Sequence, residues 1–175
     1  MADPIKDLLD REAIRNAIHR LAGAVDRRDA KRMESCYHPD AMEDHGAFCG
    51  DVATFIGLCT GPGSGIYQRM HHNIGTINIE LDGDVANAEA YVCASGPLIE
   101  PAADGSTQSR SIYASYIDRF ERRNGEWRIA RRIVVKDWTD VRPIHDPAEA
   151  YPLSQFWPDD TLYTQFSPRL DTAPA

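Results

Sequence analysis

The sequence lacks several features that mark whole classes of protein. No apolar run approaches the roughly 20 residues needed to span a bilayer, and the first residues lack the basic and apolar regions of a signal peptide. Basic residues are also too few for a nucleic-acid-binding surface: the formal net charge is −8, whereas binding to a phosphate backbone needs basic surface. We therefore expect a cytoplasmic protein that has neither a membrane nor a nucleic acid as a partner.

Motifs for metals and cofactors are scarce as well. The four cysteines, Cys36, Cys49, Cys59 and Cys93, include no CxxC pair, so zinc-ligand spacing is absent and reduced thiols are expected. No dinucleotide-binding fingerprint occurs. We expect neither a metal nor a cofactor.

The first third of the sequence has the pattern of helices. Ile14, Ile18, Leu21 and Val25 recur at steps of three and four residues, which predicts one long amphipathic helix over residues 5–28. A short helix is expected over residues 30–37 and should end at His38-Pro39, which we interpret as a turn. A short strand at 42–48 and a short helix at 51–58, capped by Asp51, complete this part.

The middle of the sequence has the pattern of strands. Period-two alternation predicts strands at 71–81, 85–95, 112–122 and 126–138. Asp82-Gly83-Asp84 and Asn124-Gly125 are tight-turn sequences that would join neighbouring strands as hairpins. Helices followed by hairpin-linked strands indicate an α+β fold with an antiparallel sheet.

The length and composition indicate one domain and a tail. We assign residues 1–140 to a single domain and residues 141–175 to a C-terminal tail. The tail combines prolines with five aromatic residues, namely Tyr151, Phe156, Trp157, Tyr163 and Phe166. Such a composition is too aromatic for a free linker, so the tail should pack on the domain or on a partner subunit.

Two adjacent histidines open the first long strand. Neighbouring residues on a strand point to opposite faces, so only one of His71 and His72 can face the covered side of the sheet. For the same reason they cannot easily bind one metal ion together. Since imidazole titrates near neutral pH, a histidine inside a pocket is a candidate general base.

The order of the motifs resembles the SnoaL-like group of the NTF2-like superfamily. The motifs are Val25-Asp26-Arg27-Arg28-Asp29, then residues 37–41, then His71-His72, then residues 120–129. The resemblance implies a cone in which a strongly curved antiparallel sheet wraps the N-terminal helices around a deep pocket. Enzymes of this group include scytalone dehydratase, bile-acid 7α-dehydratase, hexachlorocyclohexane dehydrochlorinase, polyketide cyclases and ketosteroid isomerase, and some relatives release formaldehyde from diaryl compounds.

The resemblance also implies functional residues. The matching positions give a catalytic pair, Asp26 and His72, and an arginine on the last strand, Arg132. The pocket-lining positions match Val92, Ala94, Ile112, Ala114, Tyr116 and Val134. The lysine and tryptophan of the dehydrochlorinase fall on Leu21 and near Glu43, so dechlorination of that kind is not expected.

The remaining polar candidates have open assignments. Arg132 belongs to a run with Arg128 and Arg131, so it either lies on the solvent face or stabilises negative charge in the pocket. Tyr116 is a candidate for polarising a substrate oxygen. His45, beside Asp44, is either exposed or an accessory polar group that contacts substrate.

Together with these residues, the resemblance implies a cofactor-independent lyase that acts on a small hydrophobic, aromatic or polycyclic substrate. His72 would take a proton, in a dehydration or another elimination or in a carbon–carbon cleavage that releases formaldehyde, and Asp26 would orient its ring. An isomerase or hydratase using the same pocket and a non-catalytic ligand-binding domain are the alternatives. The resemblance further implies a homodimer or a homotrimer.

Overall fold

Helices and strands are largely segregated along the chain. A computed structural model describes residues 3–61, 65–145 and 151–166. The helices are α1 (Pro4–Asp26), α2 (Ala30–Glu34), α3 (Val52–Thr60) and α4 (Thr161–Phe166), and the strands are β1 (Tyr37–Asp44), β2 (Cys49–Asp51), β3 (His71–Asp82), β4 (Val85–Pro97), β5 (Gln108–Arg123) and β6 (Glu126–Pro143). The predicted α+β fold class is therefore confirmed.

Helix α1 is capped by Asp3 and buries its predicted apolar stripe. The side chain of Asp3 accepts a hydrogen bond from the backbone N–H of Ile5 at 3.0 Å, and such N-caps satisfy donors that the first turn leaves unpaired. Ile14, Ile18 and Leu21 form the buried stripe, each at most 1% exposed. Asp26 is the last residue of the helix, so this stripe leads directly to the predicted catalytic carboxylate.

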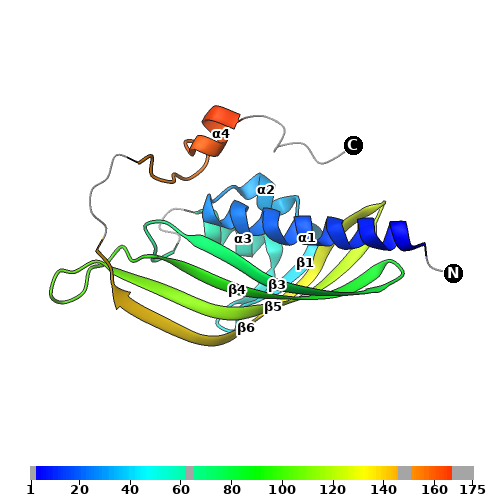
Figure 1. Ribbon diagram of the computed structural model, residues 1–175, viewed down its shortest axis with the longest axis horizontal. Coiled ribbons are helices and arrows are strands. Elements are labelled where there is room, and N and C mark those ends of the chain that lie inside the picture. Colours follow the sequence, from blue (N-terminus) through cyan, green and yellow to red (C-terminus); the bar gives the residue numbers. More distant parts are fainter. Residues whose placement is uncertain (1–2, 62–64, 146–150, 167–175) are drawn as a thin grey trace.

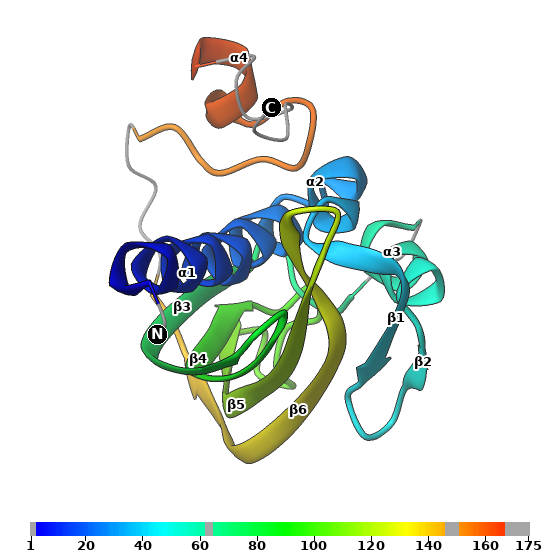
Figure 2. The same ribbon diagram turned by 90° about the vertical axis from the view of Figure 1, so that its right-hand side faces the viewer.

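The six strands form one curved, open sheet in the order β2-β1-β6-β5-β4-β3. Neighbouring strands are antiparallel except β1 and β6, which are parallel. Figure 2 shows the sheet curving beneath α1, with α2 and α3 beside its other edge, so the helices fill the concave side. Strongly twisted sheets acquire such curvature through bulges, and register shifts interrupt the β3·β4 and β5·β6 ladders.

The segment around His38-Pro39 differs from the prediction. Helix α2 ends at Glu34 and β1 already begins at Tyr37, so these two residues belong to a strand and not to a turn that ends a helix. The β1·β6 ladder is irregular between Tyr37 and Met42, and β2 pairs only with residues 42–44. Proline lacks the N–H that a regular ladder needs, and it is tolerated here because the ladder is interrupted at this point. His38 is 5% exposed and its Nε2 lies 2.8 Å from the carbonyl oxygen of Glu121.

The two longest strands extend past their predicted ends. β5 begins at Gln108 and β6 continues to Pro143, because the hairpin ladder continues from Ile112↔Thr139 out to Gln108↔Pro143. Figure 1 shows α4 on the side of α1 and α2 that faces away from the sheet. None of the described helices is long and apolar enough to cross a membrane.

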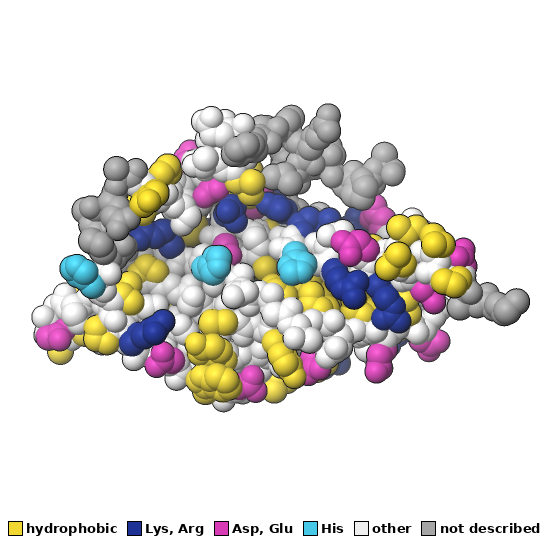
Figure 3. Space-filling view, viewed as in Figure 1, with side chains coloured by type: hydrophobic (Ala, Val, Ile, Leu, Met, Phe, Trp, Pro, Cys, Tyr) yellow, Lys and Arg dark blue, Asp and Glu magenta, His cyan; other side chains and the backbone are white. Residues whose placement is uncertain are grey.

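The outer face of the sheet carries large apolar side chains that remain exposed. They include Tyr91, Ile117, Val135 and Trp138, of which Trp138 is 57% exposed and stacks on Tyr113 with 4.6 Å between ring centroids. On the face shown in Figure 3, basic and acidic side chains are interspersed, with hydrophobic side chains among them. Exposed apolar patches of this kind are typical of interaction surfaces.

Candidate active site

The end of α1 meets the start of β3 at a carboxylate–imidazole pair. Oδ1 of Asp26 lies 2.6 Å from Nδ1 of His72, and Oδ2 accepts the backbone N–H of His72 at 3.0 Å. The two side chains are 12% and 8% exposed. His71 points the other way and is exposed. The predicted pairing of Asp26 with the second histidine is thus present in the structure.

This geometry fixes the role of each ring nitrogen of His72. An ionised carboxylate only accepts hydrogen bonds, so Nδ1 carries a hydrogen, and in the neutral ring Nε2 holds the lone pair. A carboxylate on Nδ1 also stabilises the imidazolium that forms when Nε2 takes a proton. Since both oxygens of Asp26 bind the same residue, the ring is held in one orientation.

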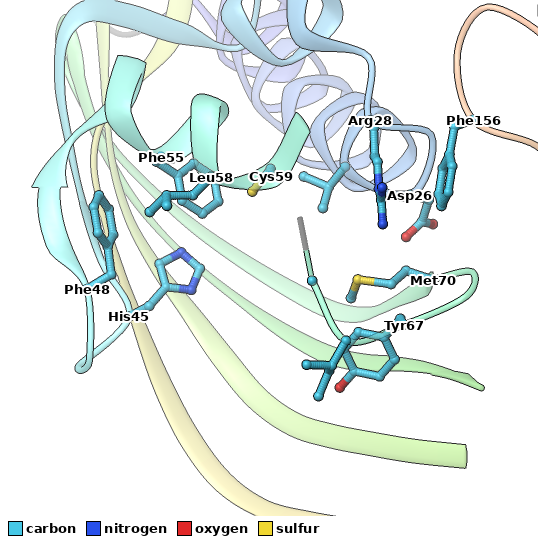
Figure 4. A pocket seen from close by; sticks show the side chains of 13 residues that line it. Asp26, Arg28, His45, Phe48, Phe55, Leu58, Cys59, Tyr67, Met70 and Phe156 are labelled. Carbon is cyan, nitrogen blue, oxygen red and sulfur yellow. The ribbon is translucent and has the colours of Figure 1, made fainter. Parts of the chain in front are cut away.

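A cavity of about 340 Å³ opens beside Asp26 (Figure 4). Its walls are formed by Val25, Asp26, Arg28, His45, Phe48, Phe55, Leu58, Cys59, Gly65, Ile66, Tyr67, Met70 and Phe156. The lining is thus mostly apolar with a few polar groups, as in small-molecule sites. His72 is not itself a lining residue and lies next to the wall through its bond to Asp26.

His45 lies on the opposite wall from Asp26 (Figure 4). Its Nε2 is 2.9 Å from Oε2 of Glu43, and its ring stacks on Phe55 with 4.8 Å between centroids. The hydroxyl of Tyr37 donates to the other oxygen of Glu43. Glu43 is fully buried, whereas the side chain of His45 is 34% exposed. The structure therefore places His45 at the cavity and gives it a partner that we did not predict.

Arg132 and Tyr116 lie in the core and not in the wall of this cavity. The guanidinium of Arg132 donates to both oxygens of Asp118, at 2.7 and 2.6 Å, and lies 4.0 Å from the ring centroid of Tyr116. Arg132 is 4% exposed, so the structure excludes the solvent-face interpretation. Burial raises the pKa of Tyr116 well above its ordinary value, so its phenol stays protonated. Direct catalytic roles for these two residues stay predictions.

The other predicted lining residues occupy the inner face of the sheet. Val92, Ala94 and Ala114 are buried, and Ile112 and Val134 pack against the core. The register places Ala94 between His72 on β3 and Ile112 on β5, so Ala94 is the cross-strand neighbour of His72. None of the five lines the cavity described above, and their contact with substrate stays a prediction.

The C-terminal segment adds an aromatic wall. Phe156 lines the cavity, and the guanidinium of Arg28 lies 3.9 Å from its ring centroid. The backbone N–H of Trp157 donates to the carbonyl of Arg27 at 2.8 Å, and Arg27 forms an ion pair with Asp160 at 3.1 Å. Residues 151–166 thus contact the end of α1, whereas residues 146–150 and 167–175 of the predicted tail lie outside the described part.

Sequence reasoning missed Glu43 and Asp118, two buried carboxylates next to the site. The position of Asp118 in the strand could have identified it, because every second residue of β5 faces inward. These inward residues are Ala114, Tyr116, Asp118 and Phe120. A charged residue at an inward position needs a partner, and Arg132 is its register neighbour. Within residues 3–61, 65–145 and 151–166, no three His, Cys, Asp or Glu side chains group closely enough to hold a metal ion.

Comparison with known proteins identifies the family. Residues 6–133 match the SnoaL-like domain, and no curated protein matches the sequence. Among solved structures, hexachlorocyclohexane dehydrochlorinase LinA-type3 from Novosphingobium barchaimii LL02 is similar, with 22% identity, a TM-score of 0.70 and coverage of 86% of this chain and 100% of that chain.

Two structures from Novosphingobium aromaticivorans are similar as well. One, provisionally assigned as a scytalone dehydratase, has 17% identity, a TM-score of 0.66 and coverage of 81% of this chain and 92% of that chain. The other, an NTF2-like protein with a cystatin-like fold, has 23% identity, a TM-score of 0.58 and coverage of 74% and 83%. These identities show the fold alone. Because the family match extends over residues 6–133, the chain belongs to the SnoaL-like family and has an NTF2-like cone fold.

Proposed function

We propose that the protein is a cofactor-independent lyase that acts on a small hydrophobic, aromatic or polycyclic molecule. Nε2 of His72 takes a carbon-bound proton, and the electrons of that C–H bond form a double bond as the leaving group departs from the adjacent carbon with its bonding pair. Asp26 orients the ring and stabilises the imidazolium. The similar solved structures include a dehydrochlorinase, whose name describes an elimination. The same proton acceptor also serves a carbon–carbon cleavage that begins at a hydroxyl and releases formaldehyde.

The bond between Asp26 and His72 is the observation that carries this proposal. It spans 2.6 Å, joins two largely buried side chains, and borders a cavity of about 340 Å³. A buried carboxylate at the C-terminal end of a helix opposes the helix dipole, so a structural role alone gives little reason for Asp26. Base catalysis of this kind contributes about 10²–10⁴ to the rate.

The test starts from compounds that co-purify with the protein. Mass spectrometry identifies them, and NMR of the reaction mixture identifies the product. We expect elimination or cleavage products from the wild-type protein, and a loss of about 10²–10⁴ in kcat for His72→Asn and for Asp26→Asn.

His71→Gln is the matched control, because His71 is adjacent but exposed on the other face of β3. It should keep full activity. Activity of His72→Asn within a few-fold of wild type would contradict the proposal. Products with rearranged or hydrated double bonds would instead assign an isomerase or hydratase, and binding without turnover would assign a ligand-binding domain.

A further inference from the structure

A second carboxylate–imidazole pair faces the cavity from the side opposite Asp26. Glu43, at the end of β1, is fully buried, and each of its oxygens has a partner: Tyr37 donates to Oε1, and Nε2 of His45 is 2.9 Å from Oε2. Burying a carboxylate costs free energy unless it is paired and hydrogen-bonded. The cost of burying Glu43 next to a cavity therefore indicates that it serves to hold a neighbouring residue in place.

The charges around Glu43 indicate which residue that is. Arg132 is its register neighbour on β6, but both oxygens of Asp118 already bind the Arg132 guanidinium. Burial raises the pKa of Tyr37 well above its usual range, so this phenol stays a neutral donor. Among the hydrogen-bond partners of Glu43, His45 is then the one that can carry a compensating positive charge.

Three contacts hold the His45 ring in place. Its backbone N–H donates to the carbonyl of Phe48 at 2.7 Å across the β1–β2 hairpin, its ring stacks on Phe55, and Nε2 binds Glu43. None of these three contacts uses Nδ1, and His45 lines the cavity. Figure 4 shows His45 and Asp26 on opposite sides of the hollow, with Phe48, Phe55 and Leu58 close to His45.

We propose that His45 binds a hydroxyl group of a flat aromatic substrate, with Glu43 and Tyr37 positioning its ring. Nδ1 of a neutral ring accepts a hydrogen bond, and Nδ1–H of a charged ring donates one. A hydroxyl fits both states because it donates and accepts, whereas an ether oxygen only accepts. The inference rests on the proposed lyase function, since it places the hydroxyl-bearing end of the same substrate.

The experiment measures equilibrium binding of three probes by calorimetry, at a pH at which 4-nitrophenol is un-ionised. 4-Nitrophenol carries a hydroxyl, 4-nitroanisole carries an ether, and nitrobenzene carries neither. We expect the wild-type protein to prefer 4-nitrophenol to both others by about tenfold, the size of one good hydrogen bond. His45→Phe keeps a ring to stack on Phe55 but removes both nitrogens, so it should abolish the preference.

The positioning residues have their own readout. Glu43→Gln and Tyr37→Phe should reduce the preference for 4-nitrophenol while affinity for nitrobenzene changes little. General loosening of the cavity would lower the affinity for all three probes and leave their ratio unchanged, so the ratio separates positioning from a structural role. His71→Gln is the control and should keep the wild-type ratio, and thermal unfolding verifies that each variant is folded.

Several results would overturn the inference. For the wild-type protein, these are equal affinity for 4-nitrophenol and either other probe, or no binding of any probe. For the variants, they are a hydroxyl preference that survives His45→Phe, or one that is lost instead in Asp26→Asn. Binding requires no turnover, so the two proposals fail separately. A hydroxyl preference with turnover that is indifferent to His72→Asn refutes only the lyase, and His72-dependent turnover without the preference refutes only the hydroxyl site.

Discussion

Replacing Arg132 with methionine should destabilise the fold more than any surface substitution. The guanidinium donates twice to Asp118, and the two side chains are 5% and 0% exposed. Methionine preserves much of the packing against Tyr116 but leaves a buried carboxylate without its cation. Removing one partner of a buried ion pair costs about 3–5 kcal/mol, and solvent screening does not reduce this figure because the pair is dry.

The loss should depend on pH, with a sign fixed by Asp118. Burial raises the pKa of Asp118 from its ordinary value of 3.8, against the opposing effect of Arg132. When the pKa of a group is higher in the folded state than in the unfolded state, its contribution to stability is fully present below the unfolded-state pKa. That contribution is lost as pH rises through the folded-state pKa. Without Arg132 the folded pKa rises further. The destabilisation caused by Arg132→Met should therefore be full at pH 7 and shrink toward pH 4.

Urea unfolding of the wild-type and variant proteins at several pH values measures this difference. Arg131→Met is the matched control: Arg131 is the exposed neighbour on β6, so its replacement should change the unfolding free energy by less than about 0.5 kcal/mol. Adding Asp118→Leu to Arg132→Met should recover much of the loss, because apolar pairs replace buried ion pairs well. A loss below about 1 kcal/mol, or one that grows in acid, would refute the reasoning.

Three further outcomes follow from the geometry. Burial, reinforced by a nearby carboxylate, raises the pKa of Cys59 to about 12, so iodoacetamide at pH 8 should label the exposed Cys49 first by peptide mass spectrometry, and earlier labelling of Cys59 would contradict this. Burial opposes ionisation of Asp160, but backbone N–H bonds and Arg27 outweigh it and lower its pKa. Docking of residues 151–166 should therefore weaken as pH falls below 3.8, and limited proteolysis within this segment should increase. In Asp160→Asn this segment should be cleaved at every pH. We propose that the outer sheet face joins subunits, so light scattering should give a dimer or trimer, and a monomer for Trp138→Glu.

The sequence predicted the parts of the fold that depend on periodicity. The apolar stripe of α1 and the alternating inward residues of β3–β6 follow directly from where apolar residues recur in the sequence. The two hairpins follow from the tight-turn sequences Asp82-Gly83-Asp84 and Asn124-Gly125. The parallel pairing of β1 with β6 was not predictable in this way, because it joins strands distant in sequence. Pro39 further concealed β1, since a proline usually ends a regular element, and here it falls in an irregular part of the ladder.

The candidate site was likewise predictable only in part from the sequence. Asp26 and His72 were found through a resemblance between motifs, since no local spacing joins a helix end to a strand 46 positions later. Glu43 was missed because the strand was predicted to start at residue 42, which hid the inward alternation of Tyr37, Ala41 and Glu43. Arg132 was identified, but its partner was not, although inward parity on β5 and β6 predicts such a pair.

The two imidazoles have consequences for specificity that the apolar walls do not. A hydrophobic wall selects mainly by size and cannot strongly reject an isostere that only gains a hydroxyl. One hydrogen bond to the partly exposed His45 should add about tenfold for a molecule that carries a hydroxyl in the right place. Glu43 is fully buried, so its bond to His45 keeps the ring in position for that hydroxyl. The position of a hydroxyl relative to the reacting carbon should therefore select among molecules of similar ring size.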